Sequence, residues 1–140
     1  MWNKSLWLTL PLLAALFWAS YTWHQTTNAG PFSYFRSKYP ELTEKQLLEV
    51  ANSDIYQFAK AQKDISNITK FMESIGFKTK VLQGELLKRS TMGENTKFYY
   101  VYEYRYGYFG KSHKWSFAIL IYNNDSLRVL NSFQVCTSCP

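Results

Sequence analysis

The chain has 140 residues, of which 46% are hydrophobic and 19% aromatic, and its formal net charge is +6. This length is enough for one small domain with its own hydrophobic core beside a short terminal segment. The lysines are scattered and the arginines form no cluster, so the charge pattern is not that of a nucleic-acid-binding protein. We expect no nucleic-acid partner. The basic surface is expected first to aid solubility, and the alternative is that it attracts anionic lipid headgroups or an acidic partner.

An uncharged apolar stretch opens the chain. After a basic lead over residues 1–4, residues 5–23 run for 19 residues without a charge. As a helix rising 1.5 Å per residue, this stretch would be roughly 28 Å long, close to the ~30 Å hydrocarbon core of a bilayer. Aromatic rings, which favour the headgroup level, mark both of its borders: Trp2, Trp7, Trp18, Tyr21 and Trp23. Residues 1–23 are therefore predicted to be a transmembrane signal anchor in the lipid bilayer.

A cleaved secretory signal is the alternative interpretation of the same stretch, because it shares the basic start and the apolar centre. Cleavage requires small residues at the last and third-last positions of the signal. A cut after Ala19 would place Phe17 at the third-last position, and a cut after Ser20 would place Trp18 there. Both rings are too bulky for that position, so an uncleaved anchor is favoured.

The charges on either side of the stretch bear on its orientation. Lys4 favours an N-terminus inside, which would put the rest of the chain on the periplasmic or another extracytoplasmic side, whereas Arg36 and Lys38 favour the opposite topology. We expect the first orientation. Residues 24–40 are predicted to be a juxtamembrane linker, since Gly30-Pro31 breaks regular structure.

Helices are expected next along the chain. Thr43-x-x-Gln46 matches a capping box and predicts a short helix that Asn52-Ser53 interrupts. Residues 53–75 then repeat apolar side chains at close to 3.6 residues, which predicts a longer helix. Gly76 is placed to end it in a left-handed cap, and residues 64–67 are expected to kink or split it.

Alternating apolar residues predict four strands after the helices. Their expected ranges are 77–89, with a bulge or a point of close backbone approach at Gly84, and then 97–109, 114–122 and 127–135. Short connections make successive strands antiparallel, and helices followed by strands predict an α+β domain, not alternating βαβ units. Residues 41–135 are thus expected to form one domain in which one or two helices pack on a four-stranded antiparallel meander.

A row of aromatic residues distinguishes the second strand. Phenylalanine or tyrosine occupies every even position from 98 to 108, and the period of two puts all of these rings on one face. The rings either form the floor beneath the long helix or bind an extended peptide or apolar helix of a partner. The candidate partner-binding residues are Tyr100, Tyr102, Tyr104, Tyr106 and Tyr108.

Two cysteines, Cys136 and Cys139, form a Cys-x-x-Cys motif in a C-terminal tail over residues 136–140. The motif is used by thiol oxidoreductases and by copper(I) or zinc sites. Redox motifs usually stand at a helix N-terminus, and only Pro140 follows here. An exposed disulfide or a pair of free thiols is therefore expected first, and thiol exchange or copper(I) handling is the alternative.

No other pattern predicts catalysis. The sequence has no Ser-His-Asp set, no glycine-rich phosphate loop and no paired histidines with metal-ligand spacing. His113 is expected to be a solvated residue of the hairpin over residues 107–114. We expect no catalytic residue, no cofactor and no metal site.

Four short motifs lie within residues 53–135: Ser53-Asp-Ile-Tyr56-x-x-Ala59, Ile75-Gly76, Gly84-Glu-Leu86 and Gly110-Lys-Ser-His-Lys. With these motifs the chain resembles the cytochrome oxidase assembly factor family related to a mitochondrial inner-membrane translocase subunit. The resemblance implies a single-pass protein whose small α+β domain acts in the assembly of a respiratory complex, without catalysis. Phe77-Lys78 replaces the family's proline-containing turn, and the tyrosine row and the Cys-x-x-Cys tail are not part of its pattern. Cystatin-like and nuclear-transport-factor-like domains are similar in architecture.

The sequence therefore predicts a single-pass, membrane-tethered, non-enzymatic binding or assembly module. Its partner would be a protein or complex in the same membrane, contacted through the aromatic face or through the hairpin over residues 107–114. Two alternatives remain. One is a thiol-disulfide or copper(I)-handling protein that acts through Cys136 and Cys139, and the other is a secreted cystatin-like inhibitor, which would require cleavage of the anchor.

Overall fold

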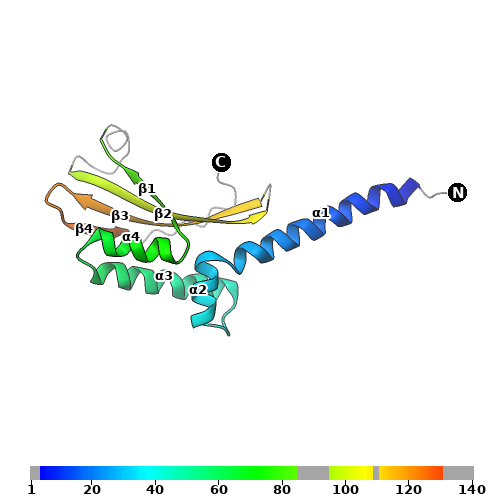
Figure 1. The fold of residues 1–140 in the computed structure, drawn as a ribbon, viewed down its shortest axis with the longest axis horizontal. Helices are drawn as coiled ribbons and strands as arrows, with labels where there is room; N and C mark the ends of the chain where they lie inside the picture. The colour runs from blue at the N-terminus through cyan, green and yellow to red at the C-terminus, as the bar shows by residue number, and fades with distance from the viewer. Residues whose placement is uncertain (1–3, 85–94, 109–110, 131–140) are drawn as a thin grey trace.

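A computed structural model describes residues 4–84, 95–108 and 111–130, with side chains described from residue 9 onward and not at 108, 111 and 112 (Figure 1). The helices are α1 (Lys4–Thr27), α2 (Gly30–Lys38), α3 (Glu44–Ala61) and α4 (Ile65–Ser74). The strands are β1 (Lys78–Leu82), β2 (Thr96–Tyr108), β3 (Lys111–Tyr122) and β4 (Leu127–Leu130). The strands form one sheet in the order β1-β2-β3-β4, and each pairs with its neighbour antiparallel. The predicted α+β class with a four-stranded meander is confirmed.

The helices that form the domain core lie on one face of the sheet, while α1 extends away from it (Figure 1). β2 and β3 are the longest strands, and their register sets Tyr102 opposite Phe117 and Tyr104 opposite Trp115. The even positions of β2 and the odd positions of β3 therefore share the face beneath the helices. Phe117 and Trp115 are fully buried there.

The segment expected to be a linker is largely helical and contributes to the core. α1 continues to Thr27, and α2 begins at Gly30, with Pro31 in its first turn, where a missing N–H costs no hydrogen bond. Phe32 and Phe35 of α2 are buried against the sheet and the other helices. The break expected at Gly30-Pro31 is a helix boundary, and the chain on both sides of it is regular.

The predicted boundary between the two central helices is wrong, although the capping box at Thr43 is confirmed. α3 runs without interruption through Asn52, because the Asn52 amide oxygen accepts a hydrogen bond from Trp115 Nε1 at 2.9 Å and does not compete for the helix backbone. The helices separate instead before Asp64. Its carboxylate caps α4 by accepting from the Ser66 amide at 2.9 Å, so residues 64–67 split the helix as expected.

The described bounds of the second strand agree closely with expectation, whereas those of the first and third strands differ. β1 ends at Leu82, and Gly84 lies in the turn after it with φ 62°, not in a bulge. β3 begins at Lys111, further into the hairpin than predicted, while β2 is described as far as Tyr108. The tip of the hairpin at residues 109–110 lies outside the described residues. The end of the fourth strand predicted over 131–135 also lies outside them.

Candidate functional site

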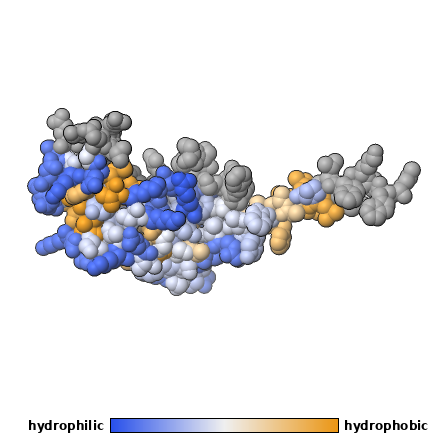
Figure 2. All heavy atoms as spheres, turned by 45° about the horizontal axis from the view of Figure 1, so that its top comes forward, coloured by the Kyte–Doolittle hydropathy of each residue, from blue (hydrophilic) through white to orange (hydrophobic). Residues whose placement is uncertain are grey.

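The first half of α1 projects from the domain and exposes large apolar side chains (Figures 1 and 2). Six of these are 60% to 75% exposed: Leu10, Leu12, Leu13, Leu16, Phe17 and Trp18. At 100° per residue these positions are distributed around the whole circumference of the helix, so no single face is apolar. Within the described part of the chain, no helix is both long enough and apolar enough to span a membrane.

The last turn of α1 packs against the C-terminal end of β2. Thr26 makes two contacts there: its carbonyl oxygen accepts from Tyr104 Oη at 2.7 Å, and its hydroxyl oxygen accepts from the Gly107 amide at 2.9 Å. Each bond joins residues about 80 positions apart in the chain. The exposed half of α1 and its docked end therefore belong to one continuous helix that is held at a fixed place on the sheet.

An aromatic cluster surrounds this docking point. The Trp23 ring lies edge-on to the His113 ring, with centroids 5.2 Å apart, and the His113 ring stacks on Tyr106 at 5.1 Å. His113 is only 9% exposed, so the expectation of a solvated hairpin residue is wrong. The reason is that β3 extends to Lys111 and turns His113 toward α1, across the strand pair from Tyr106.

The structure places four members of the tyrosine row, Tyr100 to Tyr106 at the even positions, beneath the helices. Tyr102 and Tyr106 are buried, while Tyr100 and Tyr104 are partly buried and pack against the core. The side chain of Tyr108 lies outside the described side chains. No contact with a partner tests the row, so a partner-binding role for it stays a prediction.

Tyr102 provides a test of this packing. Burial raises its pKa to about 12, although the contact of its hydroxyl with Thr69 Oγ1 at 2.8 Å opposes that shift. The folded protein therefore retains the proton between pH 10 and 12, where the unfolded chain loses it. The free energy of unfolding should fall by roughly 1 kcal/mol per pH unit over this interval.

Tyr102→Phe should remove the share of the alkaline loss that comes from this residue and leave the share of Tyr106, whose pKa burial also raises to about 12. The substitution should also cost about 1 kcal/mol at pH 7 through the missing hydrogen bond. Urea unfolding at a series of pH values in detergent micelles measures both effects. Tyr34→Phe, which removes a hydroxyl from an exposed ring of α2, is the matched control. If the free energy of unfolding of Tyr102→Phe fell as steeply between pH 10 and 12 as that of the wild-type protein, Tyr102 would not be a source of this pH dependence.

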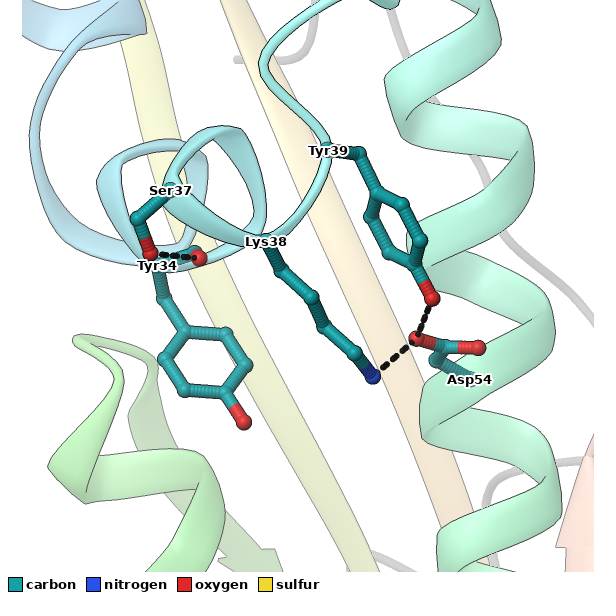
Figure 3. A network of polar contacts seen from close by, with 5 residues as sticks. All are labelled: Tyr34, Ser37, Lys38, Tyr39 and Asp54. Carbon is teal, nitrogen blue, oxygen red and sulfur yellow. Dashed lines mark hydrogen bonds and ion pairs between the residues drawn. The ribbon is translucent and has the colours of Figure 1, made fainter.

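Polar contacts hold the C-terminal end of α2 on α3 (Figure 3). Asp54 Oδ2 accepts from Lys38 Nζ at 2.8 Å and from Tyr39 Oη at 2.7 Å. Burial acts to raise the pKa of Asp54, but these two hydrogen bonds outweigh it and the net shift is downward. The contact is therefore complete at neutral pH and weakens only as the pH falls through that lowered pKa.

A hollow that the sequence did not predict lies between α3 and the edge strand β4. Its volume is about 470 Å³, and its walls include Tyr56 and Lys60 of α3 and Arg128 and Val129 of β4. The two walls are separated by about 70 positions in the sequence, and neither carries a motif. Only the folded arrangement brings these residues together.

Cys136 and Cys139 lie outside the described residues, so their pairing stays a prediction. Among residues 9–84, 95–107 and 113–130, no three histidine, cysteine or carboxylate side chains lie close enough together to hold a metal ion.

Fold and site together define a small α+β domain that carries a projecting apolar helix. The chain matches no family model, no curated protein and no solved structure. The resemblance to respiratory-complex assembly factors therefore stays a prediction from short motifs.

Proposed function

We propose that the protein is a membrane-tethered, non-enzymatic binding module whose α+β domain contacts a partner protein in the same membrane. The observation that supports this most directly is the division of α1 into an exposed apolar half and a docked end. The apolar half, together with the residues before it, would insert into the bilayer as a single-pass anchor. The domain would lie on the extracytoplasmic side.

The energetics favour lipid over water for the exposed half. A large aliphatic or aromatic side chain gains about 1.5–3 kcal/mol when it leaves water, and the six such side chains of α1 named above are at least 60% exposed. A helix that is apolar around its whole circumference is typical of a buried or membrane-embedded helix. A one-sided docking surface on the domain could not cover all of these side chains.

The docked end determines how such a tether would work. Because Thr26 is hydrogen-bonded to Tyr104 and Gly107, the domain cannot rotate freely about a flexible linker. α1 would hold the sheet close to the membrane surface in one orientation. That geometry suits a module that recognises a membrane protein, and it agrees with the assembly role that the short motifs suggest.

Membrane attachment is tested by alkaline carbonate extraction of membranes that contain the full-length protein. We expect the wild-type chain to stay in the membrane pellet. Leu12→Asp/Leu16→Asp should move most of the protein to the soluble fraction, because each carboxylate near the bilayer centre strongly opposes insertion. These side chains are exposed, so the domain should remain folded.

Tyr34→Asp/Val81→Asp is the matched control, since it places two carboxylates at exposed apolar positions of the domain and should leave the protein in the pellet. Release of the wild-type chain by carbonate would refute the tether. Equal release of both double variants would show that added charge, and not its position in α1, controls attachment.

A further inference from the structure

The hairpin end of β2 and β3 points in the same direction as the projecting half of α1 (Figure 1). The Thr26 hydroxyl oxygen accepts from the Gly107 amide at 2.9 Å. One turn earlier in α1, the Trp23 ring centroid lies 6.0 Å from that of Tyr106 and 5.2 Å from that of His113. Contacts of described side chains therefore fix the place of this end of the sheet relative to the proposed anchor.

The position of α1 in a bilayer would set the depth of the hairpin end. The exposed apolar side chains of the projecting half run to Trp18, and the amphipathic ring of Tyr21, a type that favours the headgroup level, is 53% exposed. At 1.5 Å per residue, Trp23 lies about 7.5 Å beyond Trp18 along the helix. The headgroup layer on each side of the hydrocarbon core is roughly 5–8 Å thick. With Trp18 at the hydrocarbon border, the strand residues that contact Trp23 lie at the outer limit of the headgroups.

Two cations stand next to these contacts. Arg105 of β2 lies directly opposite Lys114 of β3 in the strand register. Because the even positions of β2 carry the face beneath the helices, this pair lies on the other face of the sheet. We call Arg105 and Lys114 the hairpin cations.

Only one of the hairpin cations has a compensating carboxylate, although like charges directly opposite each other destabilise a sheet. Lys114 Nζ lies 3.3 Å from Glu103 Oε1, and the other oxygen of that carboxylate pairs with Lys80 Nζ at 2.6 Å. Arg105 is exposed and has no carboxylate within ion-pair distance among the contacts of the described residues. The charge of Arg105 is therefore available to an external anion.

The surroundings of Arg105 favour an anionic membrane surface as the source of that anion. Glu44 of α3 acts on Tyr106 from the helix side, so the sheet separates its carboxylate from Arg105. The attraction of an anionic bilayer for arginine and lysine falls off within about one Debye length, 8–10 Å at ordinary ionic strength. At the depth of Trp23, the hairpin cations would lie within this range whenever α1 is inserted.

We propose that the hairpin cations bind the headgroups of anionic lipids, with the Arg105 guanidinium on lipid phosphate. The planar fork of a guanidinium matches two phosphate oxygens at once, and Lys114 adds a second positive charge beside it. The contact attaches the domain to the bilayer at a second point and sets the tilt of the sheet. This proposal rests on the proposed tether, but it concerns residues of β2 and β3 that lie outside the anchor.

The reaction of Arg105 with phenylglyoxal, a neutral reagent that modifies guanidinium groups, tests the contact in full-length protein reconstituted in lipid nanodiscs. We expect peptide mass spectrometry to show roughly fivefold slower modification of Arg105 in phosphatidylglycerol than in phosphatidylcholine nanodiscs, because anionic headgroups engage the side chain. Raising the salt to about 1 M, where the Debye length is about 3 Å, should remove most of this protection.

Arg128 is the matched control within the same molecule. It is also exposed and shares the face of Arg105, but it lies in β4, at the opposite end of the sheet from the hairpin. Its modification rate should be the same in both kinds of nanodisc. Soluble glycerol phosphate, added to phosphatidylcholine nanodiscs, should not protect Arg105, because it is not held at the depth of the hairpin end.

Three results would overturn the proposal: equal Arg105 rates in the two kinds of nanodisc, equal slowing of Arg128, or equal protection of Arg105 by soluble glycerol phosphate. Carbonate extraction reports on the anchor alone. Equal Arg105 rates together with an intact wild-type pellet would reject the lipid contact and leave the tether standing. Release of the wild-type chain by carbonate would overturn both.

Discussion

Replacing Gly76 with alanine is expected to lower the free energy of unfolding by about 3 kcal/mol, because the new side chain combines backbone strain with a clash. Gly76 has φ 107°, a conformation that side-chain-bearing residues rarely adopt. An added Cβ would lie 2.8 Å from Gly30 Cα and 3.3 Å from Pro31 Cδ. The nearest of these atoms is backbone, so the α1–α2 corner would have to move away from the α4–β1 corner.

Gly84→Ala is the matched control for this prediction. Gly84 also has a positive φ, 62°, but a Cβ built there meets no atom within 4 Å. We expect a loss of about 1 kcal/mol, which is the cost of the left-handed conformation alone. Urea unfolding of both variants in detergent micelles, followed by circular dichroism, separates the cost of the backbone strain from the cost of the clash. Equal losses would show that the contact between Gly76 and Gly30 contributes nothing.

Gly76 shows which structural features a local sequence pattern can predict and which it cannot. Its position after an apolar-periodic segment predicted a left-handed cap, and the structure has one. The Phe77 amide donates to the Met72 carbonyl and the Gly76 amide to the Glu73 carbonyl, both at 3.0 Å, which is the Schellman pattern. No local sequence pattern indicated that Gly76 lies close to Gly30, because the two residues belong to different corners of the fold.

The predictions that failed share a physical cause. Asn52 was expected to interrupt a helix because its amide can compete for backbone hydrogen bonds, but the indole of Trp115 engages it. His113 was expected in solvent because lysines flank it, but the end of α1 covers it. In both cases a partner distant in sequence overrides a local preference, and no pattern within a short window can reveal it.

The candidate site, like the fold, was predicted from the sequence only in part. Alternation placed the tyrosines of β2 on one face, and the burial of Tyr102 and Tyr106 agrees with the expectation of a floor beneath helices. The docking of Thr26 on Tyr104 and Gly107 was not expected, since residues 24–40 were interpreted as a linker. The hollow between α3 and β4 was missed because it exists only between the packed surfaces of these two elements.

Trp115→Ala is expected to be among the most destabilising substitutions in the domain, with a loss of about 3–5 kcal/mol. The indole is fully buried at the centre of the core. Its ring centroid lies 5.2 Å from those of both Phe32 and Phe77, so it contacts α2 and the start of β1 from the middle of β3. Truncation would leave a large cavity between the sheet and the helices that this ring joins.

The hydrogen bond from Trp115 to Asn52 can be measured apart from this packing. Trp115→Phe and Asn52→Ala, singly and together, form a double-mutant cycle whose coupling energy we expect to be about 1 kcal/mol. Trp18→Ala is the control, since that ring is 68% exposed on α1 and should not change domain unfolding in micelles. A coupling energy near zero would mean that α3 stays continuous at Asn52 without the indole. In that case the break before Asp64 would be determined by its own cap alone.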